Sequence, residues 1–487
     1  MTIEHDEEIG AREAMQDVKE PLIEHRKING HENKSYSQGN GDKGSNLVVF
    51  ISTMVAVMGS FEFGSCVGYT APTQTSIIKD LNLSVAEFSL FGSILSIGAV
   101  LGATTSGRIA DHFGRKGALA MSTVSCIIGW VAIYFSREAM SLDIGRFLTG
   151  YGIGVSSYVV PIYIGEIAPK NLRGGLGTLN QLMIVIGAST ACFVGTIVTW
   201  RVLALTGIIP CIILLVGLIY IPESPRWLAK AGQMKRFESA LRMLRGKDAD
   251  ISTEAYEIQE YIETIEHLPK VRMLDLFQQR YKRSVTIGVG LMLLQQLGGA
   301  NGMGFYASEM FVAAGFPSGK FGIIMYASIQ IPITAIGAML MDRSGRKPLL
   351  LVSSAGTFFG CFLVGSAFLA KRFGFFVTEA PYLVLGGALL YIGSFSIGAG
   401  AIPWVMMAEI FPINVKGVAG GLVNLVHWFC AWAVSYTFNF FFNYSAAGTF
   451  YFYAAACALN VLFVAKLVPE TKGKTLEDIQ VTINQIK

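Results

Sequence analysis

Long apolar stretches alternate with short polar segments between residues 47 and 468. Twelve windows of about 20 mainly apolar residues can be marked, each long enough to cross a lipid bilayer as a helix. They lie near 47–69, 88–106, 118–136, 142–165, 175–198, 202–221, 284–312, 321–341, 348–370, 381–408, 418–441 and 448–468. The pattern therefore predicts an all-α membrane protein with twelve transmembrane helices.

Polar segments flank and divide these stretches, and they set the expected domain boundaries. The segment before residue 47 is charged and has no apolar period, which predicts a disordered cytoplasmic tail and not a cleavable signal. The central segment places Phe237, Leu241 and Leu244 at helical spacing, which predicts short linker helices. The expected order is a tail at 1–46, a six-helix bundle at 47–221, cytoplasmic linker helices at 222–283, a second six-helix bundle at 284–468 and a cytoplasmic tail at 469–487.

Three short motifs occur twice, in the same order and far apart in the chain. They are D-x-x-G-R-K from Asp111 and Asp342, E-I-x-P-x-x-x-[R/K]-G from Glu166 and Glu409, and P-E-[S/T] from Pro222 and Pro469. The offsets are 231, 243 and 247 residues (342 − 111, 409 − 166 and 469 − 222). Offsets that grow slowly indicate two similar halves with small insertions in the second. Membrane proteins built by such a duplication are usually transporters.

Basic residues gather on one side of the predicted spans. An even number of spans places both termini on that side, which carries the linker and the loop residues Arg108, Arg115, Lys116, Lys170, Arg173, Arg343, Arg346, Lys347 and Lys416. The loops of the other side hold fewer basic residues. By the positive-inside rule, both termini and the linker are predicted to be cytoplasmic.

The composition agrees with a membrane protein and argues against several other classes. Charged residues make up 15% of the chain, against about 25% in typical soluble domains. The formal net charge of +4 follows from the cytoplasmic loops, and nothing indicates nucleic acid binding. All seven cysteines lie inside predicted spans, so neither a disulfide framework nor a metal site is expected. With no recognisable nucleophile–base pair or phosphate loop, we expect no enzyme and no cofactor.

The acids of the repeated motifs are candidates for a gate on the cytoplasmic side. Glu166 and Glu409 end the fourth and tenth spans, where an unpaired carboxylate is costly. The pairs that would relieve this cost are Glu166 with Arg115 or Arg173, and Glu409 with Arg346 or Lys416. Such pairs can bias an equilibrium between two states, whereas simple anchoring of the loops at the anionic leaflet leaves the acids unexplained. The predicted gate residues are Arg108, Asp111, Arg115, Glu166, Arg173, Asp342, Arg346, Glu409 and Lys416.

Further motifs accompany these repeats. They are G-R-x-A-D-x-x-G-R-K at 107–116, P-x-Y-x-x-E at 161–166, P-E-S-P-R-W-L at 222–228, Q-Q-L-G-G-x-N at 295–301 and P-E-T-K-G-K-T-L-E at 469–477. In this order they resemble the sugar porter family of the major facilitator superfamily, and residues 63–72 are similar to its plant early-responsive-to-dehydration-like branch. The resemblance implies two pseudo-symmetric six-helix bundles that carry a monosaccharide, a hexose such as glucose or fructose, by alternating access.

Polar side chains inside the apolar spans are few, and their types suit a sugar. A sugar offers hydroxyl groups around a weakly apolar ring, so its site needs amides and an aromatic platform without net charge. The candidates are Gln181, Gln295, Gln296, Asn301, Gln330, Trp404 and His427. The resemblance assigns sugar contacts to the amides and stacking or gating to Trp404. Hydrogen bonding between packed helices is the alternative role for each polar side chain.

Glycine and proline mark expected breaks in the spans that carry these residues. Gln295 and Asn301 stand six positions apart and share a helix face only if the helix is distorted, which the glycines between them permit. Pro161 in the fourth span and residues 398–403 in the tenth predict similar breaks. Broken helices near the membrane midplane commonly line transport sites.

His427 departs from the family pattern, which usually has Asn or Gln before the tryptophan that is Trp428 here. A neutral imidazole can replace the amide, and it would also make binding sensitive to pH. A hydrogen bond between packed helices is the alternative role.

The resemblance also bears on how transport is driven. Proton-coupled sugar porters pair an aspartate in the first span with an arginine in the fourth, which Arg146 matches. The aspartate position is Cys66 here, and a thiol is a poor substitute for a carboxylate, which favours a facilitative uniporter. The alternative is a proton-coupled symporter or antiporter that uses Glu62, four residues earlier on the same helical face. A sugar receptor without net flux is a further alternative, which the intact gate motifs disfavour.

The N-terminal tail carries a candidate sorting signal. Glu20–Pro21–Leu22–Ile23 resembles an acidic dileucine signal, whose partners would be sorting adaptors. With the branch resemblance, it predicts a multi-pass protein of the vacuolar membrane, and the plasma membrane is the alternative. The other expected partners are a small-molecule sugar and the lipid bilayer.

Overall fold

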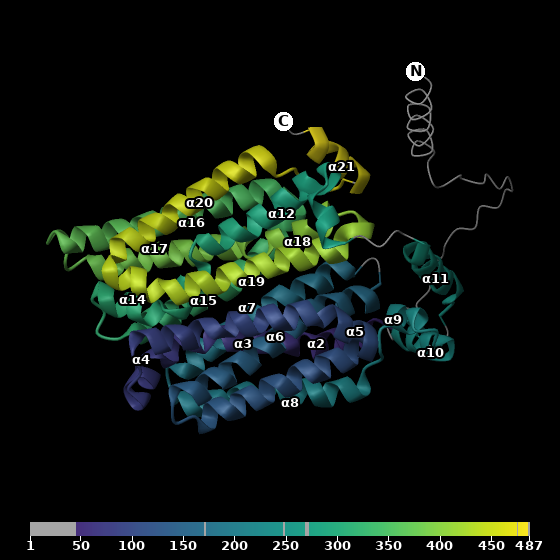
Figure 1. Ribbon diagram of the computed structural model, residues 1–487, viewed down its shortest axis with the longest axis horizontal. Helices are drawn as coiled ribbons and strands as arrows, with labels where there is room; N and C mark the ends of the chain where they lie inside the picture. The colour runs from purple at the N-terminus through teal and green to yellow at the C-terminus, as the bar shows by residue number, and fades with distance from the viewer. Residues whose placement is uncertain (1–44, 170–171, 247–248, 268–271, 475, 486–487) are drawn as a thin grey trace, which may run out of the picture. The chain divides into compact units, whose positions relative to one another are not determined.

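Helices account for every regular element in the part of the chain that the structure describes (Figure 1). The structure is a computed structural model, and it describes residues 45–485 apart from 170–171, 247–248, 268–271 and 475. The predicted tail at 1–46 lies outside the described residues except for its last two positions, and so does its Leu22–Ile23 signal. The described helices all belong to one compact unit, residues 43–487.

The first half forms the N-terminal bundle. Its helices are α2 (Ser45–Ala56), α3 (Met58–Gly68), α4 (Thr70–Leu81), α5 (Val85–Phe135), α6 (Ala139–Ile167), α7 (Arg173–Gly195) and α8 (Trp200–Tyr220). The first predicted span continues beyond its expected end, because α4 extends it to Leu81. Helix α5 joins two predicted spans through a kink at Gly114, and α6 runs through Pro161 without the expected break.

The second half forms the C-terminal bundle. Its helices are α12 (Gln279–Leu297), α13 (Ala300–Phe305), α14 (Ala307–Ala314), α15 (Gly319–Ser344), α16 (Arg346–Arg372), α17 (Ala380–Ser394), the π-helical turn η2 (Phe395–Ala399), α18 (Ile402–Ile410), α19 (Ile413–Tyr444) and α20 (Ala446–Leu467). Two predicted spans are broken as expected. The seventh is divided at Gly299, whose φ is +87°, and the tenth is interrupted by η2.

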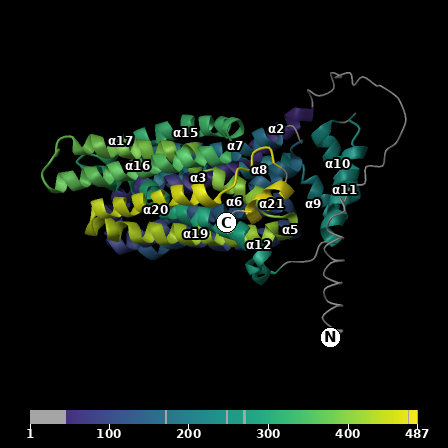
Figure 2. The ribbon, with the colours of Figure 1, turned by 90° about the horizontal axis from the view of Figure 1, so that it is seen from above.

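The described helices confirm the predicted all-α membrane fold of two six-helix bundles. Among the residues that the structure describes, ten helical stretches are long and apolar enough to cross a membrane. Helix α5 counts once among them although it covers two windows, and the broken seventh span does not count. Every one of the twelve predicted windows therefore corresponds to a helix or to consecutive helices. Figures 1 and 2 show the long helices of each half running side by side.

Short helices lie at one end of the bundles. They are α9 (Pro225–Lys230), α10 (Met234–Arg245), α11 (Ser252–His267), the 3-10 turn η1 (Met273–Phe277) and the C-terminal α21 (Leu476–Gln485). The side chains of Phe237, Leu241 and Leu244 are buried, as their helical spacing predicts. We call the end that carries the two D-x-x-G-R-K turns, 111–116 and 342–347, the motif end. The other end is called the opposite end.

Glycines allow the helices within a bundle to approach closely. A Cβ atom on Gly98 of α5 would lie 2.3 Å from the carbonyl oxygen of Phe147 on α6. One on Gly150 of α6 would lie 2.2 Å from the carbonyl oxygen of Leu95 on α5. In lipid, where no hydrophobic force drives helices together, such close backbone contact is a main source of packing energy.

Candidate functional site

The break at Gly299 brings two candidate amides together in the C-terminal bundle. Helix α12 ends at Leu297, and the left-handed backbone at Gly299 turns the chain before α13 begins. Nδ2 of Asn301 thereby donates a hydrogen bond to Oε1 of Gln296 at 2.8 Å. The distortion that the sequence requires for these residues to meet is present, and glycine is the residue that allows this φ at little cost.

Two further helices join this amide pair. Nε2 of Gln295 donates to the carbonyl oxygen of Ala399 in η2 at 2.5 Å, which links α12 to the broken tenth span. Nε2 of Gln296 lies 3.3 Å from Nδ1 of His427 on α19. The rings of His427 and Trp404 of α18 meet edge to face, with centroids 4.7 Å apart.

Five of the seven predicted sugar-site residues thus form one cluster, which we call the amide cluster: Gln295, Gln296, Asn301, Trp404 and His427. It combines carboxamides, an imidazole and an indole, as a site for a neutral, hydroxyl-rich ligand requires.

The other two candidates stand on helices that meet across the two bundles. Gln181 is on α7 and Gln330 is on α15, and both side chains are half-buried. Their helices are joined by Ser189, whose Oγ donates to the carbonyl oxygen of Ala327 at 3.0 Å. Within the described residues, neither amide is hydrogen-bonded to the amide cluster, so their role in binding stays a prediction.

A second buried polar group lies in the N-terminal bundle around Glu62. Nε1 of Trp130 donates to Oε1 of Glu62 at 2.5 Å, and Sγ of Cys66 lies 3.3 Å from the same oxygen. Oε2 of Glu62 is buried without a hydrogen-bond partner among the described residues. The residues around Glu62 therefore offer it neutral donors and no salt bridge.

Arg146, the other candidate for proton coupling, is surrounded by aromatic rings and a hydroxyl group. Its Nη2 donates to Oγ1 of Thr70. Its guanidinium carbon lies 5.6 Å from the ring centroid of Tyr69 and 5.2 Å from that of Phe91. Aromatic faces stabilise a desolvated guanidinium through their quadrupoles. Within the described residues, Arg146 therefore makes neither a hydrogen bond nor a salt bridge to Glu62.

The carboxylates at the motif end are paired within each bundle. Nε and Nη2 of Arg115 donate to the two oxygens of Glu166, each at 2.8 Å. Nη2 of Arg346 lies 3.0 Å from Oε1 of Glu409, whose other oxygen accepts from Thr471 at 2.6 Å. Of the alternatives left open by the sequence, the partners are thus the arginines of the D-x-x-G-R-K motifs.

The other predicted gate residues differ in their surroundings. Asp111 pairs with Arg115 at 3.4 Å and with Nζ of Lys230 at 3.2 Å. Arg108 and Lys416 are exposed, and neither makes an ion pair in the part of the chain that the structure describes. The side chain of Asp342 lies outside the described residues.

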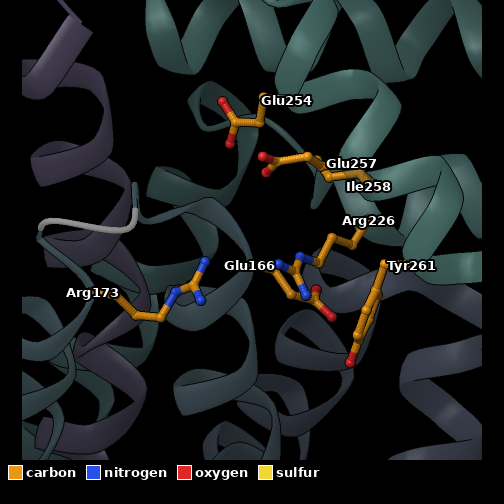
Figure 3. Close-up of a pocket in the computed structure, with 7 residues that line it drawn as sticks. All are labelled: Glu166, Arg173, Arg226, Glu254, Glu257, Ile258 and Tyr261. Atoms are coloured by element: carbon orange, nitrogen blue, oxygen red, sulfur yellow. The ribbon is translucent and has the colours of Figure 1, made fainter. Parts of the chain in front are cut away.

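Arg173 faces a cavity of about 190 Å³ at the motif end. The lining residues come from α6, α7, α9 and α11, and Figure 3 shows them: Glu166, Arg173, Arg226, Glu254, Glu257, Ile258 and Tyr261. Glu254 is held by Arg245 through two hydrogen bonds of 2.8 Å, and Arg226 lies over the ring of Tyr261. Arg173 therefore shares a cavity with Glu166 while Glu166 is bound to Arg115.

The P-E-[S/T] motifs have a structural role that the sequence analysis left unassigned. Both carboxyl oxygens of Glu223 accept backbone N–H groups, from Arg115 and from Lys116, each at 3.1 Å. Glu470 accepts the N–H groups of Arg346 and Lys347, each at 3.0 Å. Each glutamate therefore caps the helix that follows a D-x-x-G-R-K turn. The repetition of the motif in both halves was the available signal for this role.

The pKa values of the two capping glutamates are shifted in opposite directions. Burial raises the pKa of Glu223 despite its backbone donors. Burial also acts to raise the pKa of Glu470, but donation from four backbone N–H groups outweighs it and lowers the pKa of Glu470 below the ordinary value. Because the N–H donors favour the charged form, acidification of the motif side would weaken the cap of the N-terminal bundle first.

Contacts between the two bundles are found from the middle of the helices to the opposite end. Nε2 of Gln74 on α4 donates to Oε2 of Glu309 on α14 at 2.5 Å. Nδ2 of Asn439 on α19 donates to Oγ of Ser89 on α5 at 2.9 Å. Nζ of Lys320 reaches the carbonyl oxygen of Thr196 at 2.7 Å. These bonds hold the opposite end closed.

Several glycines near the motif ends of α7 and α19 have open space beside them. A Cβ atom added at any of six glycines on α7 and α19 would meet no heavy atom within 4 Å: Gly174, Gly175, Gly177, Gly417, Gly420 and Gly421. At the opposite half of the bundles, in contrast, a Cβ atom on Gly92 of α5 would lie 2.6 Å from Oη of Tyr306. In the part of the chain that the structure describes, the hydrogen bonds between the bundles therefore lie away from the motif end.

Weakening the contacts at the opposite end should shift the equilibrium between the state that is closed at that end and the state that is closed at the motif end. Replacing Gln74 with leucine removes the hydrogen bond to Glu309 and leaves that carboxylate without its donor, a loss of about 0.5–1.5 kcal/mol. We expect a maleimide to label a Gly420→Cys reporter about two- to tenfold more slowly, because the motif end closes more often. The native cysteines are all buried and give little background. Ser84→Ala, which removes a helix cap at the same end, should leave the labelling rate unchanged; an equal effect of both variants would contradict the assignment.

Comparison with known proteins places the chain in a family. A family model described as "Sugar (and other) transporter" matches residues 48–482. Sugar transporter ERD6-like 16 of Arabidopsis thaliana is 59% identical over 471 residues, covering 97% of this chain and 96% of that protein. Sugar transporter ERD6-like 7 of the same plant is 59% identical over 437 residues, covering 90% and 94%.

Solved structures agree with this relationship. The proton:xylose symporter XylE bound to 6-bromo-6-deoxy-D-glucose is 27% identical, with a TM-score of 0.74, covering 90% of this chain and 99% of that one. XylE from E. coli in an inward open conformation has a TM-score of 0.73 at 27% identity, covering 89% and 99%. The matching family model and the relatives named above are sugar transporters, so the chain is a membrane transporter and not an enzyme. The chain belongs to the sugar porter family of the major facilitator superfamily, in its ERD6-like branch.

Proposed function

We propose that this sugar transporter carries monosaccharides, hexoses such as glucose or fructose, and that it works as a facilitative uniporter with its motif end in the cytoplasm. The observation that carries the proposal is the amide cluster, in which two glutamines, an asparagine, a histidine and Trp404 are joined at breaks in two helices. Gln181 and Gln330 are proposed to complete the site from the helices that meet across the bundles.

Alternating access is supported by the asymmetry between the two ends. The bonds between the bundles at the opposite end would have to break for a sugar to enter from that side. The pairs Arg115–Glu166 and Arg346–Glu409 hold each bundle rigid at the motif end. We propose that Arg173 and Lys416, which make no ion pair within the described residues, engage when that end closes.

Counterflow tests whether the protein is a carrier or a receptor. Proteoliposomes loaded with unlabelled glucose or fructose should take up labelled sugar transiently above the equilibrium level, because a carrier exchanges bound sugar across the membrane. The same vesicles without internal sugar should show no overshoot. Sugar binding without any exchange would favour a receptor and contradict the proposal.

Glu62 is the residue on which proton coupling would depend, and its unpaired Oε2 is the observation that favours this second candidate function. A uniporter should tolerate Glu62→Gln with uptake within about twofold of the wild-type level, because the amide oxygen can still accept from Trp130. Glu62→Leu is the matched variant, and it should lower stability by leaving the Trp130 N–H unpaired. If Glu62→Gln abolished a response of uptake to a pH gradient, the protein would be proton-coupled.

The vacuolar membrane is the compartment that we propose for this transporter, and the N-terminal dileucine is its proposed signal. A fluorescent fusion expressed in plant cells should label the vacuolar membrane. Replacing Leu22 and Ile23 together with alanine should move most of the fusion to another membrane, because sorting adaptors would no longer bind. Replacement of Lys27 and Ile28, in the same tail, is the control. A fusion at the plasma membrane in both forms would contradict the proposal.

A further inference from the structure

His427 is held in an orientation that can be traced to a backbone carbonyl. The carbonyl oxygen of Ala399 can only accept a hydrogen bond, so the group of Gln295 that contacts it at 2.5 Å is the amide nitrogen. The amide oxygen of Gln295 therefore points away from Ala399. It lies 3.4 Å from Nε2 of Gln296.

The next amide is oriented by the same logic. Oε1 of Gln296 accepts from Nδ2 of Asn301 at 2.8 Å, while its Nε2 faces Oε1 of Gln295. Reversing the Gln296 amide would place its oxygen against the Gln295 oxygen and its nitrogen against the Asn301 nitrogen. The network thus fixes which end of Gln296 faces His427, and that end is the nitrogen, 3.3 Å from Nδ1.

An amide nitrogen carries only donors, so Nδ1 of His427 must accept. A neutral imidazole that accepts at Nδ1 carries its proton on Nε2. Trp404 and Trp428 lie edge to face with the ring, at centroid distances of 4.7 and 5.3 Å, and limit its rotation. The side chain is 8% exposed, and no hydrogen bond from Nε2 to another protein group is seen in the part of the chain that the structure describes.

We propose that Gln296 holds His427 as the Nε2-protonated neutral imidazole, and that this N–H donates to the transported sugar and selects for an acceptor oxygen at one ring position. The proposal rests on the proposed sugar site. An asparagine or glutamine at this position would offer both a donor and an acceptor. His427 offers only the donor, because its acceptor is occupied by Gln296.

The tautomer can be measured without any transport. Protein labelled with ¹⁵N-histidine in nanodiscs should give a His427 signal, identified by its absence in His427→Asn, with Nδ1 unprotonated and Nε2 protonated. Gln296→Glu should move a proton onto Nδ1, because a carboxylate can only accept. Asn460→Asp, in the same bundle but outside the amide cluster, is the matched control and should leave the signal unchanged. Protonation at Nδ1 in the wild type, or an identical signal in Gln296→Glu, would overturn the proposal.

The donor role is tested with glucose analogues in which one hydroxyl is replaced by hydrogen or by fluorine. Fluorine can accept weakly but cannot donate, and hydrogen does neither. At one ring position the deoxy analogue should bind at least about fivefold more weakly than the fluoro analogue, as expected for one lost hydrogen bond. His427→Phe should remove this difference at that position only, and His427→Asn should restore it in part.

The outcomes separate this inference from the proposed function. If no analogue distinguishes fluorine from hydrogen in the wild type, or if His427→Phe leaves the pattern unchanged, the donor role is wrong although sugar still binds. If no sugar binds, the proposed function fails, and the donor role with it, while the tautomer of His427 is still reported by the ¹⁵N signal.

Discussion

Replacing Gln296 with leucine is expected to raise the KM for sugar uptake by one to two orders of magnitude. Gln296 is the centre of the amide cluster, since it contacts Gln295, Asn301 and His427. Leucine has a similar volume, but it removes a proposed sugar ligand and leaves the polar partners of Gln296 without their bonds. Unpaired buried polar groups cost about 1–3 kcal/mol each. The measurement is initial uptake into proteoliposomes over a range of glucose concentrations.

The matched control is Asn460→Leu, in the same bundle but outside the cluster. Nδ2 of Asn460 donates to Oγ of Ser354 at 3.0 Å and links α20 to α16. Its loss should lower thermal stability while leaving the KM for sugar unchanged. An unaltered KM in Gln296→Leu, or an equal rise in both variants, would show that the amide cluster is not the sugar site.

Replacing Gly114 with alanine is expected to destabilise the motif end by at least about 2 kcal/mol and to reduce transport severalfold. Gly114 has a φ of +81° and a ψ of 174°, a backbone region essentially confined to glycine that costs other residues about 1–3 kcal/mol. An added Cβ atom would also lie 2.5 Å from Oε2 of Glu223. Glu223 would then move and release the N–H groups of Arg115 and Lys116. The measurements are thermal unfolding of the purified protein and its uptake activity.

The equivalent glycine of the second half provides a repeat of this test, and another glycine of the first half provides a control. Gly345 has a φ of +91°, and its added Cβ atom would lie 2.6 Å from Oε2 of Glu470, so Gly345→Ala should behave alike. Gly165→Ala, next to Glu166 on a regular helix with no heavy atom within 4 Å, should be neutral or slightly stabilising. A wild-type unfolding temperature and full uptake for Gly114→Ala would contradict the role of the turn.

The sequence was sufficient for features that depend on local chemistry. Length and apolarity alone specify the twelve windows, because a helix needs a fixed number of residues to cross a bilayer. The six-residue separation of Gln295 and Asn301 demanded a distortion, and Gly299 provides it. Glycine with a positive φ acts locally, so its effect is visible in the sequence.

Proline predicted helix breaks less reliably than glycine did. Pro161 predicts a break in the fourth span, yet α6 continues through it. In a transmembrane helix, neighbouring helices and local adjustment can satisfy the freed carbonyl group, so a proline does not determine a break. The outcome at Pro161 therefore depends on tertiary packing.

Pairings between distant side chains depended on helix rotation and turn geometry, which the sequence does not specify. Arg115 and not Arg173 holds Glu166, because the turn at Gly114 directs the guanidinium toward α6. Glu62 meets Trp130 and Cys66 instead of Arg146, because these donors face it from α5 and from its own helix. In both cases the residue types showed which acids need a partner. Which side chain becomes that partner depends on how the helices pack.

The most direct test of the account is the uptake of labelled glucose and fructose into proteoliposomes, with and without an imposed pH gradient. A facilitative uniporter brings the internal sugar to the external concentration and no further, at the same level with either direction of the gradient. Accumulation above that level, lost in Glu62→Gln, would show that Glu62 couples sugar to protons and would contradict the uniport mechanism. An absence of uptake of both sugars would contradict hexose transport itself.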